Sequence, residues 1–209
     1  MKNYLPLTVL GRSIRVWLAM TAMMAATWAY AQPEQGDFNY ELRIGAAMST
    51  LSSAPETKQH FGFEWDLGVE YMATDQLGLA LEFRNEYLGT QFKIEREDLR
   101  LDYISVPLLA KYHITPWLAV QAGPQVGFLV KAKNGGIGIS NDCHKVEFSI
   151  PMGIALTPFA FKNGDAIVLD LRYRLGLTNV YKNTDYTDGD NWCNRAVQLT
   201  IGYRTDFVK

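Results

Sequence analysis

Charged residues two positions apart are the clearest chemical feature of this 209-residue chain. In the stretch 167–177, Asp170, Arg172 and Arg174 alternate with leucine and tyrosine. The same spacing recurs in other segments, in Glu41, Arg43, Glu64, Asp66, Glu70, Glu82, Arg84, Glu86 and Arg204. Acidic and basic groups held in a confined space would form ion pairs, and a continuous line of them could instead conduct ions. The elements that carry these residues decide between the two roles.

An alternation with a period of two predicts β-strands whose two faces differ. We expect eight strands, at 38–48, 61–72, 77–88, 99–112, 118–130, 146–156, 166–178 and 195–207. The fourth is the least regular, because the apolar phase changes near Tyr103 and Ile104. That change predicts a β-bulge, and Pro107, which lacks a backbone donor, fits the same irregularity. The predicted class is all-β.

The N-terminus and the connections indicate which face meets which solvent. Lys2, Arg12 and Arg15 precede an apolar run at 16–28 and the sequence Ala29-Tyr30-Ala31. This pattern predicts a secretory signal peptide at 1–31, removed before a domain at 32–209, with a retained membrane anchor as the alternative. The connections at 74–76, 113–116 and 162–165 are short, whereas those at 51–60, 90–98, 131–145 and 181–194 are longer and polar. Short turns on one side and long loops on the other are typical of outer-membrane barrels.

These features together predict an eight-stranded antiparallel up-and-down transmembrane β-barrel in the outer membrane of a Gram-negative cell. Its apolar face would meet lipid and its charged face the lumen. Aromatic residues would form a girdle at each membrane interface. The short-turn side carries Tyr40, Tyr71, Tyr112, Trp117, Phe159, Phe161, Tyr203 and Phe207, and the long-loop side Phe61, Phe63, Tyr87, Phe128 and Phe148.

The lumen of an eight-stranded barrel is about wide enough for its own side chains. Because the inward charges have both signs, we expect them to pair and plug the lumen. A lipid-facing arginine would cost roughly 2–4 kcal/mol at the bilayer midplane, so the orientation of each strand is strongly determined. An ion path remains the alternative.

The two cysteines, Cys143 and Cys193, lie in the third and fourth long loops. Export to an oxidising space predicts a disulfide between them. The alternative is a metal site in which Cys143 and Cys193 join Asp142, His144, Asp188 and Asp190. The spacing of these residues matches no zinc or calcium pattern, so we expect no metal or cofactor.

Enzymatic chemistry has little support. The histidines are His60, His113 and His144, and the chain has no Gly-x-Ser-x-Gly sequence. His113 is expected in a short turn without a catalytic role. We expect no catalytic residues, and a membrane-embedded hydrolase is the least favoured interpretation.

Three segments, 101–130, 169–180 and 194–207, resemble the PorT-like outer-membrane β-barrel proteins of the porin family. The shared features are Tyr103, Val106-Pro107-Leu108-Leu109, Ala122-Gly123-Pro124, Arg172-Tyr173, Gly176-Leu177-Thr178-Asn179, Gln198, Gly202 and Tyr203. The resemblance implies the fold and the membrane location, and it also allows a role as an accessory component of a secretion system. Such barrels often end on an aromatic residue that the assembly machinery reads, whereas here Val208 and Lys209 follow Phe207.

We therefore expect a non-enzymatic outer-membrane protein with a structural or interaction role for its cell-surface loops. A secretion-system accessory and a narrow channel are the alternatives. The expected partners are outer-membrane lipid, the barrel assembly machinery and a periplasmic or secretion-system protein, with the chain itself monomeric. A net charge of −2 argues against binding nucleic acid.

Overall fold

The computed structural model describes residues 34–54, 57–92, 98–183 and 189–206. The expected signal peptide at 1–31 and the C-terminal Phe207 lie outside the described residues. The strands are β1 (Phe38–Leu51), β2 (Thr57–Met72), β3 (Leu77–Phe92), β4 (Asp98–Thr115), β5 (Leu118–Ala122), β6 (Gln125–Asn134), β7 (Ile137–Gly138), β8 (Val146–Ala160), β9 (Ala166–Asn179) and β10 (Cys193–Asp206).

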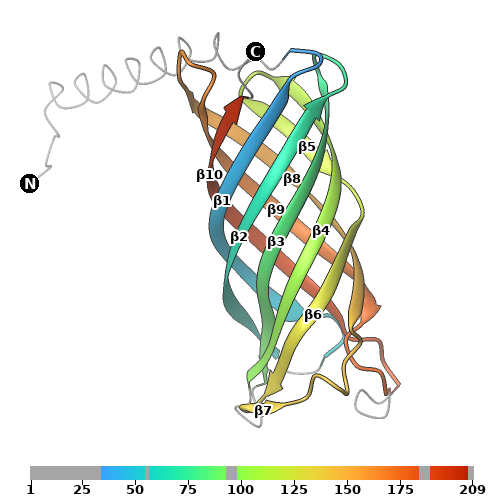
Figure 1. Cartoon of the computed structure of the whole chain (residues 1–209). Coiled ribbons are helices and arrows are strands. Elements are labelled where there is room, and N and C mark those ends of the chain that lie inside the picture. Colours follow the sequence, from blue (N-terminus) through green and yellow to red (C-terminus); the bar gives the residue numbers. More distant parts are fainter. Residues whose placement is uncertain (1–33, 55–56, 93–97, 184–188, 207–209) are drawn as a thin grey trace, which may run out of the picture.

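The strands form a closed antiparallel barrel. β1 to β4 pair in sequence order, as do β8 to β10, and β1 pairs with β10 from Asn39 opposite Asp206 to Leu51 opposite Asn194. β5 and β6 occupy one position in the ring, between β4 and β8, so the ring has eight members as predicted. Figure 1 shows the steep tilt of the strands, with the start of β1 and the end of β10 at one end and β7 at the other. No helix long and apolar enough to cross a bilayer occurs in the described part of the chain.

The predicted fifth strand is divided at Gly123 and Pro124 into β5 and β6. Pro124 has no backbone N–H, and its carbonyl accepts a hydrogen bond from the Leu108 N–H at 2.9 Å. A Cβ atom on Gly123 would lie 2.0 Å from the Leu108 carbonyl oxygen. Glycine is therefore required for this close backbone approach.

The predicted change of phase within the fourth strand is wrong. Leu99, Leu101 and Tyr103 are buried, and the residues that follow them in β4 keep the same alternation. The register shift lies on the partner strand, since Asp102 pairs with Lys131 but Tyr103 pairs with Leu129. Val130 is therefore the extra residue, and the bulge lies in β6. The sequence indicated the correct level of the barrel but the wrong strand.

The outer surface carries the apolar belt. Large apolar side chains are exposed on every strand position of the ring, including Leu42 at 53% and Leu199 at 57%. The aromatic residues predicted for the two girdles are exposed where described, among them Tyr71 at the short-turn end and Phe148 near the long loops, except Trp117, which is half-buried. β1 to β4 have 14 to 18 residues, more than the about 9–11 that a tilted strand needs to cross a bilayer. The extra length therefore extends beyond a bilayer of ordinary thickness.

Candidate functional site

The lumen holds the residues that the sequence singled out. All ten predicted members of the ion-pair network are at most 5% exposed: Glu41, Arg43, Glu64, Asp66, Glu82, Arg84, Asp170, Arg172, Arg174 and Arg204. Glu70 and Glu86, also expected inside, are buried as well. The alternation of each strand explains this placement, since the residue on either side of each charge faces outward.

Arg43 and Arg172 form the centre of the network. Arg43 on β1 contacts Asp66 at 2.6 Å, Asp170 at 3.1 Å and Glu82. Arg172 on β9 holds Glu82 on β3 with two hydrogen bonds of 2.6 and 2.8 Å, and contacts Asp170 at 2.8 Å. The pairs of Arg43 with Asp170 and of both arginines with Glu82 join strands that are not neighbours in the ring. They therefore fill the width of the lumen as well as neutralising charge.

Toward the short turns, the network continues through residues that were not predicted from the sequence. Lys111 on β4 lies 3.1 Å from Glu41 and 3.2 Å from Glu70, and the His113 ring nitrogen lies 2.8 Å from Glu70. His113 therefore lies in β4 and contributes to the filling of the lumen, whereas the sequence placed it in a short turn. The sequence does contain a signal for Lys111. It is the only charged residue between Pro107 and Tyr112, and its position alternates with the outward-facing residues of β4, so it must face the lumen.

A second branch runs from the centre toward the long loops. Arg84 contacts Glu64 at 3.2 Å, and the Gln198 side-chain amide joins Glu64 to Glu86 with two hydrogen bonds of 2.7 Å. Arg174 lies 3.7 Å from Glu86 and 3.2 Å from Glu147. Glu147 was also missed, although its position between Val146 and Phe148 is the signal of an inward charge.

An apolar cluster closes the lumen above this branch. Leu51, Leu88, Leu99, Leu101, Tyr103 and Leu129 from the barrel pack with Cys143, Val180 and Tyr181 from the loops. The Arg174 guanidinium lies 5.7 Å from the centre of the Tyr103 ring, which joins the charged network to the apolar cluster. We call this cluster the outer cap. Its residues from β4 are Leu99, Leu101 and Tyr103. The predicted phase change would have turned these three residues outward.

The disulfide predicted between Cys143 and Cys193 is not formed in the structure, where both are free, buried thiols. Cys143 pairs with Tyr181 on one edge of the chain that follows β9, and Cys193 pairs with Asn179 on the other edge. Val180 between them hydrogen-bonds His144 on one side and Trp192 on the other, each at 2.9 Å.

Two strand spacings separate the cysteines by about 9–10 Å. A disulfide requires Cα atoms within about 7 Å. Burial, with a smaller contribution from Asp142, raises the pKa of the Cys143 thiol to about 11.

The described residues form no metal site. No group of three or more histidine, cysteine, aspartate or glutamate side chains in the described ranges could hold a metal ion. Asp188, one member of the alternative site, lies outside the described residues, and Asp142 and His144 are exposed. His60 and His144 lie near the long loops, far along the barrel from His113.

The comparison with protein families decides the identity of the barrel. A profile described as "Outer membrane protein beta-barrel domain" matches residues 30–182. The chain belongs to this family. No curated protein matches it.

Solved structures of outer-membrane proteins are similar to this chain over most of its length. A major outer membrane protein from Thermus thermophilus is 12% identical, with a TM-score of 0.50 over 81% of this chain and 99% of that one. Neisserial surface protein A is 16% identical, with a TM-score of 0.49 over 81% and 97%. Ail of Yersinia pestis, in complex with the heparin analogue sucrose octasulfate, is 18% identical, with a TM-score of 0.48 over 81% and 99%.

The family confirms the fold and the location expected from the sequence. This outer-membrane barrel resides in the cell outer membrane, with its apolar belt in lipid and its charged residues in the lumen.

Proposed function

We propose that this outer-membrane barrel is a closed scaffold that holds its outer loops in place for interactions at the cell surface. The observation that carries the proposal is the continuous filling of the lumen. Ion pairs and hydrogen bonds link His113 at the short-turn end to Glu147 near the long loops, and the outer cap lies beyond Glu147.

The filling argues against a channel. An ion entering the lumen would have to separate charged pairs that are already in contact, in a space with little water to replace them. The cavity beside Lys111 and His113 has a volume of about 10 Å³, which is about the space of one water molecule. Beyond the network, the leucines of the outer cap offer an ion no ligand.

Planar-bilayer recording tests closure. Refolded protein should add no steady conductance, because both the network and the outer cap must open for an ion to pass. Steady single-channel steps from the wild-type barrel would contradict the scaffold and favour the narrow channel.

The outer loops are the surface that remains for interaction. Aromatic contacts of Trp192 anchor the loops to the outer cap. Its ring centre lies 5.9 Å from that of Phe92 and 6.0 Å from that of Tyr181. Ile137, in β7, is 73% exposed beyond this anchored layer. A rigid base with an exposed apolar tip is a suitable form for a contact surface.

Site-specific photo-crosslinking in living cells tests the side on which a partner binds. A photoreactive residue at Ile137 should give protein or glycan adducts, and one at the exposed Thr74 of a short turn should not. Adducts at Thr74 alone would contradict the proposal and favour a periplasmic or secretion-system partner.

The finer identity of the chain is part of the same proposal. The motifs around Pro107 and Pro124 support a PorT-like branch of the family. We propose that the chain is exported with removal of residues 1–31, inserted by the barrel assembly machinery, and monomeric. N-terminal sequencing of the mature protein should begin at Gln32.

A further inference from the structure

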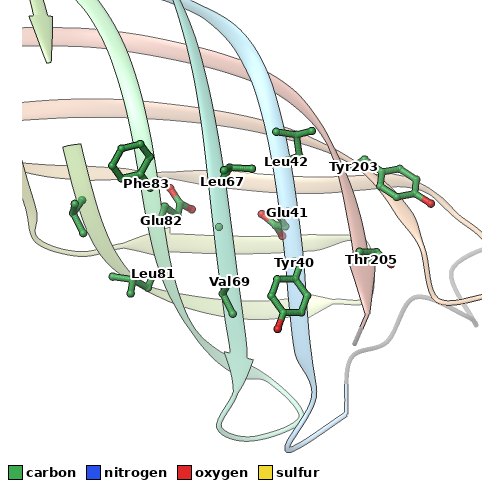
Figure 2. A pocket seen from close by; sticks show the side chains of 12 residues that line it. Tyr40, Glu41, Leu42, Leu67, Val69, Leu81, Glu82, Phe83, Tyr203 and Thr205 are labelled. Atoms are coloured by element: carbon green, nitrogen blue, oxygen red, sulfur yellow. The ribbon is translucent and has the colours of Figure 1, made fainter. Parts of the chain in front are cut away.

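A groove of about 540 Å³ lies on the outer wall of the barrel, on β10 and β1 to β4. Figure 2 shows Leu42, Leu67 and Val69 on this wall, with the ring of Phe83 on one side and that of Tyr203 on the other. The three aliphatic residues are 36% to 53% exposed. The volume is within the range of about 300–1,000 Å³ that is typical of small-molecule sites.

The groove is apolar because the strand alternation turns every nearby charge into the lumen. Glu41 on β1 and Glu82 on β3 belong to its lining. Their carboxylates, however, contact Lys111 and Arg172 inside the barrel. The groove therefore presents hydrocarbon to the bilayer, and a lipid chain is the molecule that this position supplies.

One end of the groove reaches the short-turn interface. Tyr40 is the third residue of β1, and Figure 2 shows its hydroxyl directed toward the turn that follows β2. The Tyr203 hydroxyl donates a hydrogen bond to Asp165, in the turn between β8 and β9. Thr205, which also lines the groove, hydrogen-bonds Asp165 as well. The lining thus changes from aliphatic to hydroxyl-bearing along its length, which suits an amphipathic ligand.

The charge at this end selects among headgroups. Hydrogen bonds from Tyr203, Thr205 and Asn163 lower the pKa of Asp165, so its carboxylate is charged at neutral pH. Asp206 approaches the same turn, since a Cβ atom on Gly164 would lie 2.5 Å from its carboxylate oxygen. Two carboxylates attract an ammonium group and repel an anionic headgroup.

We propose that this groove binds one phospholipid of the periplasmic leaflet, with an acyl chain along Leu42 and Leu67 and a zwitterionic amine headgroup beside Asp165. Phosphatidylethanolamine is the headgroup class that fits, and phosphatidylglycerol is disfavoured. The site is independent of the outer loops, so it goes beyond the proposed surface role.

Native mass spectrometry of the folded barrel tests the site. Protein equilibrated in mixed micelles with equal phosphatidylethanolamine and phosphatidylglycerol should retain one phosphatidylethanolamine. Leu67→Trp fills the groove and should lose the bound lipid, whereas Leu171→Trp, on an exposed position of β9 outside it, should keep it. Asp165→Asn should keep a lipid but lose the preference between the headgroups.

The heat-shifted gel mobility of each variant shows that it has folded. Equal lipid retention by Leu67→Trp and Leu171→Trp would overturn the site, and so would a wild-type barrel that retains no lipid. Equal retention of both headgroups by the wild type would overturn the role of Asp165. A mass of two protein chains that Leu67→Trp abolishes would assign the groove to a second copy and also overturn the proposal.

Discussion

Replacing Arg43 with methionine tests whether the lumen network stabilises the barrel. Arg43 is completely buried at the centre of the network, where it contacts carboxylates of Glu41, Asp66, Glu82 and Asp170. Methionine retains much of the side-chain volume but none of the charge. The variant therefore leaves four carboxylates around an apolar group.

The surviving partners determine the size of the effect. Glu82 and Asp170 keep Arg172, at 2.6 and 2.8 Å. Asp66 keeps only Arg84, at 3.8 Å, so it becomes the least compensated charge. Removing one partner from a buried pair costs about 3–5 kcal/mol of unfolding free energy. We expect Arg43→Met to fall in that range.

Arg100→Met is the matched control. Arg100 pairs with Asp98 at 3.3 Å, but its side chain is 62% exposed, and such a surface pair contributes about 0–1 kcal/mol. The double variant Arg43→Met with Asp66→Asn removes the least compensated charge, so it should be more stable than Arg43→Met alone.

Equilibrium unfolding in urea from lipid vesicles, followed by heat-shifted gel mobility, gives the free energies. If Arg43→Met and Arg100→Met destabilise the barrel equally, the network does not stabilise it. If the Asp66→Asn change lowers stability further in the Arg43→Met background, the assignment of Asp66 as the uncompensated group is wrong.

Four further predictions use the same preparation. Gly123→Ala should lower the unfolding free energy by about 1–3 kcal/mol, because its Cβ would collide with the Leu108 carbonyl. Gly138→Ala is the control and should leave the unfolding free energy unchanged, because a Cβ atom there would meet no atom within 4 Å. Equal effects of the two substitutions would refute the close approach at Gly123. Titration in denaturant without reductant should find two thiols per chain, and a count of zero would restore the disulfide. In the folded barrel at pH 8, the raised pKa of about 11 for Cys143 should make its alkylation about 100-fold slower than that of an ordinary exposed thiol. In a background with Cys143 and Cys193 replaced by serine, a membrane-impermeant maleimide should label Arg100→Cys but not Leu101→Cys, and the reverse would restore the predicted phase change in the fourth strand.

The alternation in the sequence was sufficient to assign the inward face of most strands. Arg43 stands between Leu42 and Ile44, and Arg172 between Leu171 and Tyr173, so only one orientation avoids exposing a charge to lipid. The pairing of these charges could not be predicted. Arg172 on β9 contacts Glu82 on β3 across the lumen, although the two strands are not neighbours in the ring. Such contacts depend on the tilt of the strands and on the stagger of their hydrogen-bond register.

The outer cap shows why the sequence rule failed in one section of the fourth strand. The rule places apolar residues outward because lipid surrounds the barrel, but the strands continue beyond the bilayer. There, Leu99 and Leu101 point inward while Arg100 is exposed, which is the polarity of a barrel in water. The apolar side changes near Tyr103, at the level of the bulge in β6. One alternation therefore serves two solvents, and the inversion at Tyr103 marks the level at which the wall leaves the membrane and the lumen closes.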